Sequence, residues 1–106
     1  MVVSRMKDRI YSVNEIRDIV APIARKHGVA SLYLFGSYAR GEASVDSDID
    51  FLMDGGEISS LYRLAAFRLD LEDALGKPVD LLTLGHNDQG FIQKIRKDEV
   101  MIYAAA

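Results

Sequence analysis

Apolar residues recur along the chain at two different intervals, and the intervals predict a mixture of helices and strands. Over residues 13–27 they return every three or four positions, which is the period of a helix that buries one face. Ser12 and Glu15 have the S-x-x-E spacing of a capping box, which predicts the start of this helix. Gly28 predicts its end, because glycine readily adopts the left-handed conformation that closes many helices.

Two further stretches, 29–35 and 49–53, are nearly unbroken apolar runs of strand length. Such runs are typical of strands that are buried on both faces. Ser59 or Ser60 can then cap a second helix, which Gly76 ends. The apolar side of this helix is predicted to consist of Leu61, Leu64, Ala65, Leu71 and Leu75.

The last quarter of the chain continues the alternation. Residues 79–84 are predicted to form a third strand, and a turn follows at 85–87. An amphipathic helix is expected over 88–98, with its inward residues again at helical spacing. Residues 100–103 can add a short strand at an edge of the sheet.

The lengths of the connections predict the directions of the strands. About a dozen residues separate Phe35 from Asp48, too few for a helical crossover, so the first two strands should be antiparallel. The thirty residues from Asp50 to Asp80 suit a right-handed βαβ unit, so the second and third strands should be parallel. The end of the first strand and the starts of the next two therefore meet at one edge.

Composition narrows the class of protein. With 106 residues, 49% of them hydrophobic and 27% charged, the chain fits a single globular α/β or α+β domain over 1–106. The absence of cysteine excludes disulfides and thiolate metal sites. No apolar run reaches the length of a membrane span, so we expect a cytoplasmic protein without a membrane partner. The net charge of −3 argues against nucleic acid as a direct substrate.

Three carboxylates gather at the predicted sheet edge. Asp48 and Asp50 are two positions apart and therefore point to the same face, and Asp80 opens the neighbouring strand. Three close carboxylates repel one another unless a cation lies between them. Magnesium prefers oxygen ligands and combines carboxylates with substrate phosphates, so these residues predict a site for two Mg²⁺ ions. Asp80 would hold the second ion or accept the proton of a nucleophile.

The same edge offers hydrogen-bond donors for a phosphate. Gly36 lets a triphosphate approach the backbone, and Ser37 adds a hydroxyl at the start of a short helix. Arg40 could bind the same phosphates through its guanidinium group. An ion pair of Arg40 with Glu42 or an aspartate is an equally good interpretation, and each of these signals is common when it stands alone.

The order and spacing of these residues resemble a known family. G-S-Y-A-R-G at 36–41, D-S-D-I-D-F at 46–51 and V-D-L-L at 79–82 are similar to the minimal nucleotidyltransferase (MNT) branch of the DNA polymerase β-like superfamily. The resemblance implies a palm fold, in which helices pack on a small mixed β-sheet. It also implies that Gly36 and Ser37 bind nucleotide phosphate and that the three aspartates bind magnesium and catalyse the reaction.

The smallest members of this family are antitoxins encoded beside a HEPN ribonuclease toxin, and some transfer AMP from ATP to the toxin. The resemblance therefore implies an antitoxin that modifies a hydroxyl of a HEPN partner, with ATP as the donor. A chain of this size has no room for an acceptor domain, so a partner or a second copy must present the acceptor.

Three alternatives remain open at the level of the sequence. The protein could neutralise its partner by binding alone, with a vestigial or sensing nucleotide site. It could be a homodimer that modifies a small molecule, as aminoglycoside nucleotidyltransferases do. In the simplest case the aspartates are helix caps and solvated strand ends in a domain without catalysis. The base of the nucleotide and the acceptor are not encoded in any residue pattern.

Overall fold

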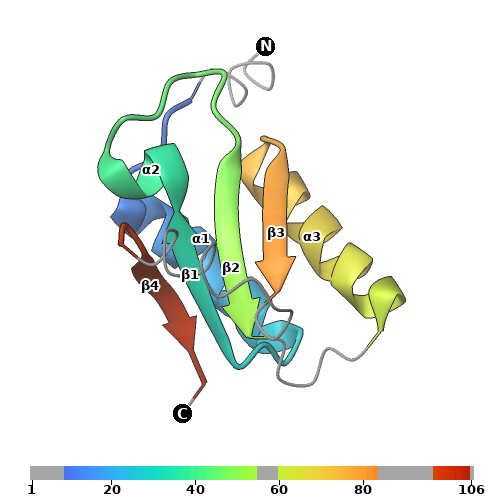
Figure 1. The fold of residues 1–106 in the computed structure, drawn as a ribbon. Helices are drawn as coiled ribbons and strands as arrows, with labels where there is room; N and C mark the ends of the chain where they lie inside the picture. The colour runs from blue at the N-terminus through green and yellow to red at the C-terminus, as the bar shows by residue number, and fades with distance from the viewer. Residues whose placement is uncertain (1–8, 55–59, 84–96, 106) are drawn as a thin grey trace.

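Helices pack on a four-stranded mixed sheet in the computed structural model, which describes residues 9–54, 60–83 and 97–105 (Figure 1). The strand order is β3-β2-β1-β4. In chain order the elements are α1 (Val13–Lys26), β1 (Ser31–Phe35), α2 (Gly36–Arg40), β2 (Ile49–Asp54), α3 (Leu61–Leu75), β3 (Val79–Thr83) and β4 (Val100–Ala104).

The strand directions confirm the predicted topology. β1 and β2 are antiparallel, with Phe35 opposite Asp50, and β2 and β3 are parallel, with Asp50 beside Asp80. β4 pairs with β1 in antiparallel fashion and forms one edge of the described sheet, as predicted. The sheet therefore brings residues from three strands to the end at which β1 finishes.

Local signals set the ends of the two long helices as predicted. At the start of α1 the Ser12 hydroxyl accepts a hydrogen bond from the Glu15 amide (3.1 Å), and the Glu15 carboxylate accepts one from the Ser12 amide (2.8 Å). Ser60, rather than Ser59, caps α3 by accepting from the Arg63 amide. Gly28 and Gly76 end the helices with φ angles of 74° and 69°, which glycine adopts without steric strain.

The core lies between the sheet and the helices α1 and α3, which contact each other and cover the same face (Figure 1). Leu32 and Leu34 of β1 and Phe51 of β2 are fully buried there. The inward side of α3 is Phe67, Leu71 and Leu75, a stripe with the four-residue spacing of one helix face. The helices thus support the strands that carry the candidate residues.

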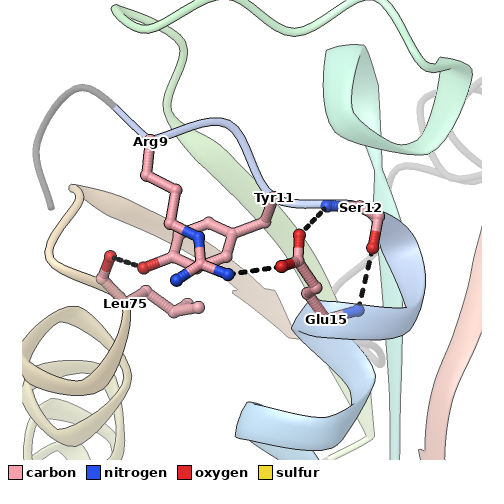
Figure 2. A network of polar contacts seen from close by, with 5 residues as sticks. All are labelled: Arg9, Tyr11, Ser12, Glu15 and Leu75. Atoms are coloured by element: carbon pink, nitrogen blue, oxygen red, sulfur yellow. Dashed lines mark hydrogen bonds and ion pairs between the residues drawn. The ribbon is translucent and has the colours of Figure 1, made fainter.

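A second set of contacts joins the N-terminal segment to the end of α3 (Figure 2). The Tyr11 hydroxyl donates to the carbonyl of Leu75 (2.5 Å), across 64 positions of the chain. The Arg9 guanidinium lies 4.9 Å from the centre of the Tyr11 ring and forms an ion pair with Glu15. The capping box of α1 and the last turn of α3 are therefore connected through Tyr11.

Two sequence predictions about burial are wrong. β1 is not buried on both faces: Tyr33 and Phe35 are partly exposed, because α1 and α3 cover the opposite face of the described sheet. Leu61 and Ala65 do not belong to the inward side of α3, since both are exposed, Leu61 by 84%.

The predicted turn at 85–87 and most of the predicted helix over 88–98 lie outside the described residues. Lys97 and Asp98, at its predicted end, form a turn before β4. Within the described ranges, no helix combines the length and the apolar character that a membrane span requires.

Candidate active site

The candidate residues lie where β1 ends and where β2 and β3 begin. α2 follows β1 directly and contacts both β1 and β2, so it covers this end of the sheet (Figure 1). The strand register places Asp50 between Phe35 on one side and Asp80 on the other. Asp48 precedes the first residue of β2 and is exposed. The fold thus brings Gly36, Asp50 and Asp80 together from three separate segments.

The backbone of Gly36 lies directly against the carboxylate of Asp50. A Cβ atom at position 36 would stand 2.4 Å from Oδ2 of Asp50, far closer than van der Waals contact allows. The φ angle of Gly36 is also positive (75°), a conformation that residues with a side chain rarely adopt. Position 36 therefore requires glycine for two independent reasons.

The surroundings of Asp50 favour its protonated form. Partial burial, the charge of Asp80 and a side-chain hydrogen bond with Asp80 raise the pKa of Asp50 from 3.8 to about 6. The charge of Asp48 raises it further, and that of Arg40 lowers it. Asp50 therefore binds a proton more readily than an isolated aspartate does, because burial and neighbouring negative charges both disfavour its ionised form.

These carboxylates have the chemistry of a magnesium site without its preassembled geometry. Among residues 9–54, 60–83 and 97–105, no three His, Cys, Asp or Glu side chains converge closely enough to hold a metal ion. The donors nevertheless suit Mg²⁺, which uses one or two carboxylates and completes its shell with water and substrate phosphates. A divalent cation between Asp50 and Asp80 would also reduce the repulsion between their charges.

Arg40 is engaged by carboxylates. Its Nε donates to Glu42 (2.9 Å) and its Nη1 to Asp98 (3.4 Å), so the ion-pair interpretation describes this structure. The hydrogen bond with Glu42 raises the pKa of Arg40. Since Arg40 also lowers the pKa of Asp50, its charge acts on the carboxylate edge even while it is paired.

Ser37 and Tyr38 occupy the first turn of α2 with different exposure. Ser37 is partly exposed, and Phe35, the N-cap, contributes no side-chain hydrogen bond to the first amides of α2. Tyr38 is 3% exposed and packs into the core, and burial raises the pKa of its hydroxyl. α2 is thus anchored by Tyr38, while Ser37 keeps part of its surface exposed.

One buried residue near this edge, Lys77, was not predicted from the sequence. Lys77, in the turn between α3 and β3, is 5% exposed and donates from Nζ to the carbonyl of Val45 (3.0 Å). The only sequence signal is its position between Gly76, which ends a helix, and Pro78, which precedes a strand. Neither neighbour predicts that the lysine side chain turns inward.

The fold and the carboxylates at this edge of the sheet together indicate the class of protein. Residues 17–106 match the family described as polymerase beta, nucleotidyltransferase, which is most of the chain. The chain therefore belongs to the nucleotidyltransferase family, and both the predicted family and the predicted fold class are confirmed.

Two related proteins are similar to most of this chain. The chain is 42% identical over 90 residues to a protein of Methanocaldococcus jannaschii provisionally named a protein adenylyltransferase, covering 85% of this chain and 91% of the relative. It is 36% identical over 80 residues to protein adenylyltransferase MntA of Thermococcus cleftensis, covering 76% and 81%.

The fold also resembles one chain in a complex of a tri-AMPylated HEPN toxin of Shewanella oneidensis with an MNT antitoxin. The TM-score is 0.67 with 19% identity, covering 88% of this chain and 73% of the other. At this identity the likeness concerns the fold alone.

Proposed function

We propose that this protein transfers AMP from ATP to a hydroxyl group of a partner protein, with pyrophosphate as the other product. The observation that carries this proposal is the set of Asp50, Asp80 and Gly36 at one sheet edge, in a chain whose relatives are named protein adenylyltransferases. Membership of the nucleotidyltransferase family supports the reaction class.

In the proposed reaction the hydroxyl oxygen of the acceptor attacks the α-phosphorus of ATP. The bond from that phosphorus to the oxygen bridging the α- and β-phosphates breaks, and pyrophosphate leaves. Asp80 accepts the hydroxyl proton, since it opens β3 beside Asp50 at the exposed end of the sheet. The open backbone at Gly36 and the hydroxyl of Ser37 bind the phosphates of the nucleotide.

We further propose that Asp48, Asp50 and Asp80 bind two Mg²⁺ ions. The support is the pKa of Asp50, which is raised to about 6 first by burial and then by the charges of Asp80 and Asp48. A bound cation would offset these effects by favouring the ionised carboxylates. Bound magnesium would supply charge stabilisation for the phosphates and the departing pyrophosphate. Arg40 lies close enough to influence Asp50, and we propose that it moves from Glu42 to the phosphates when nucleotide binds.

The proposed partner is a HEPN ribonuclease toxin, and the proposed role is that of a cytoplasmic antitoxin that modifies and so neutralises it. The support is the likeness to the relative named MntA, together with the fold shared with one chain of the complex of a tri-AMPylated HEPN toxin and an MNT antitoxin. Nucleic acid is not proposed as a direct substrate, because the net charge of the chain is −3. A homodimer is compatible with this role.

The test is transfer of label to the product of the neighbouring gene. The purified partner is incubated with the protein, Mg²⁺ and ATP labelled on either the α- or the γ-phosphate. AMP transfer puts the α-label on the partner and leaves the γ-label in pyrophosphate. Asp48→Asn and Asp50→Asn are each expected to reduce transfer by at least about 100-fold, with Asp18→Asn on the exposed face of α1 as the control.

Each alternative has a distinct result in this test. Undiminished labelling by Asp48→Asn and Asp50→Asn would contradict the mechanism. Neutralisation of the partner in cells by both variants, without any labelling, would indicate an antitoxin that acts by binding alone. Labelling of a small acceptor such as an aminoglycoside by the protein alone would indicate the small-molecule enzyme.

A further inference from the structure

Lys77 is the one charged side chain that is buried in the part of the chain that the structure describes. It lies in the short turn between α3 and β3, flanked by Gly76 and Pro78. Burial of an ammonium group is costly unless its charge and donors are satisfied by partners. A lysine at this place therefore calls for a specific contact to explain it.

One such contact is the carbonyl of Val45, which accepts a hydrogen bond from Nζ of Lys77 (3.0 Å). Val45 lies in the connection from α2 to β2, three positions before Asp48. A charged donor makes a stronger hydrogen bond to a carbonyl than a neutral one does. Lys77 thus joins the turn that leads to Asp80 with the segment that leads to Asp48.

Two further hydrogen bonds link the same elements. The Ile49 amide donates to the carbonyl of Pro78 (3.1 Å), which aligns the first residue of β2 with the turn. The Val79 amide donates to the carboxylate of Glu72 (2.9 Å), which joins the start of β3 to α3. Asp48 is therefore bracketed by a contact at Val45 on one side and one at Ile49 on the other, both to the turn at 77–78.

Asp48 depends on these contacts more than its neighbours do. Asp50 and Asp80 lie inside paired strands, so the register of the sheet defines their positions. Asp48 precedes β2 and is exposed. Its carboxylate can lie beside the other two only if the segment before the strand keeps its course.

We propose that Lys77 is a positioning residue, which holds the segment around Val45 so that Asp48 can join Asp50 and Asp80 in binding magnesium. This inference rests on the proposed function, because it assigns to Lys77 the alignment of a magnesium-binding carboxylate. Lys77 acts through the backbone of Val45 and does not itself contact the nucleotide. Residues that hold metal ligands in place affect metal affinity or activity by about 10- to 100-fold when they are replaced.

The test compares Lys77→Met with Lys26→Met. Methionine keeps the length of an unbranched side chain and removes the donor, and Lys26 provides the same change at an exposed position of α1 (74% exposed). Hydrogen–deuterium exchange of the peptide spanning 41–50 reports the segment directly and needs no activity. We expect at least about tenfold faster exchange there in Lys77→Met, and no change in Lys26→Met.

The second measurement is the Mg²⁺ concentration that the protein needs in order to bind a non-hydrolysable ATP analogue. It is expected to rise about tenfold in Lys77→Met, with kcat reduced and the KM for the acceptor unchanged. A structural role without positioning would lower the melting temperature and leave this concentration as it is in the wild type. Wild-type exchange over 41–50 in Lys77→Met, or an unaltered Mg²⁺ requirement, would overturn the proposal.

A pocket beside the side chain offers a rescue experiment. Glu72, Gly76, Lys77 and Pro78 line an open pocket of about 290 Å³. In Lys77→Ala, ethylammonium should restore slow exchange over 41–50, whereas ethanol should not. If Lys77→Met does not fold, Lys77→Leu, which also lacks a donor, is measured instead, and the same two measurements decide.

These measurements distinguish a failure of the proposed function from a failure of the role proposed for Lys77. A wild-type protein that transfers no label counts against the proposed function. Unchanged exchange in Lys77→Met counts against the role of Lys77, whatever the reaction is.

Discussion

At Gly36 a backbone requirement and a functional requirement coincide. The residue has a φ angle of 75°, and the space where a Cβ would stand is taken by the carboxylate of Asp50. Gly41, at the other end of α2, has almost the same φ angle (74°) but nothing within 4 Å of a Cβ. The two glycines therefore separate the cost of conformation from the cost of contact.

We predict that Gly36→Ala and Gly41→Ala each lower the free energy of unfolding, by about 1–2 kcal/mol for the left-handed conformation alone. Only Gly36→Ala should also displace the Asp50 carboxylate and weaken magnesium-dependent nucleotide binding. Chemical denaturation measures the first effect, and titration with a fluorescent ATP analogue measures the second. Equal nucleotide affinity in the two variants would contradict the close approach of Gly36 to Asp50.

The raised pKa of Asp50 predicts how the stability of the protein depends on pH. Its folded-state pKa of about 6 lies above the ordinary value of 3.8, so the folded protein binds more protons than the unfolded chain between these values. Stability should therefore decline as the pH rises from about 4 to about 6. Asp50→Asn removes this decline and should stabilise the magnesium-free protein at pH 7.5 by about 1 kcal/mol, a modest effect because solvent screens the partly buried group.

Melting temperatures of both proteins in EDTA, from pH 4 to pH 8, measure this difference. The two curves should coincide near pH 4 and separate above pH 5. Asp18→Asn on the exposed side of α1 serves as the control and should follow the wild type. A wild-type protein that is more stable than Asp50→Asn at pH 7.5 would show that the repulsion at Asp50 is relieved in another way.

At the scale of elements, Tyr11 connects parts of the chain that no local signal links. Its hydroxyl closes the last turn of α3 at Leu75, one residue before the turn that contains Lys77. The guanidinium group of Arg9 lies over the ring of Tyr11 and forms an ion pair with Glu15, which belongs to the capping box of α1 (Figure 2). The ends of both long helices are therefore stabilised together.

We predict that Tyr11→Phe lowers the free energy of unfolding by about 1 kcal/mol, because the Leu75 carbonyl loses its buried donor. The control is Tyr62→Phe, which removes a hydroxyl from a side chain that is 83% exposed and should change the stability little. Urea denaturation monitored by circular dichroism compares the two. A loss of equal size in both variants would show that the bond to Leu75 contributes nothing specific.

At the scale of the whole molecule, the carboxylate edge should make stability depend on ligands. A ligand that binds only the folded state stabilises it by about 2.7 kcal/mol at a concentration one hundred times its Kd. We predict that Mg²⁺ and a non-hydrolysable ATP analogue together raise the melting temperature of the wild type. Either one alone should have a smaller effect, because magnesium uses substrate phosphates to complete its shell.

Asp50→Asn should abolish this joint shift while leaving the protein folded. Differential scanning fluorimetry measures it at several concentrations of each ligand. No shift at millimolar concentrations of both ligands would favour a domain whose aspartates are only strand-end residues.

The helices, the strands and the order of the candidate residues could be predicted because their causes are local. The capping box at Ser12 and the left-handed glycines at 28 and 76 act within one or two turns of the chain. The lengths of the connections were enough to predict antiparallel β1 and β2 and parallel β2 and β3. The meeting of Gly36, Asp50 and Asp80 follows from that topology alone.

Only the tertiary structure decided the environments of the side chains, because these depend on segments that are distant in the sequence. Tyr33 and Phe35 are partly exposed because the two long helices pack on the opposite face of the described sheet. Arg40 is paired across 58 positions with Asp98, and the buried Lys77 donates a hydrogen bond to the carbonyl of Val45, 32 positions away. Periodicity and caps report on near neighbours, whereas these contacts exist only once the sheet has assembled.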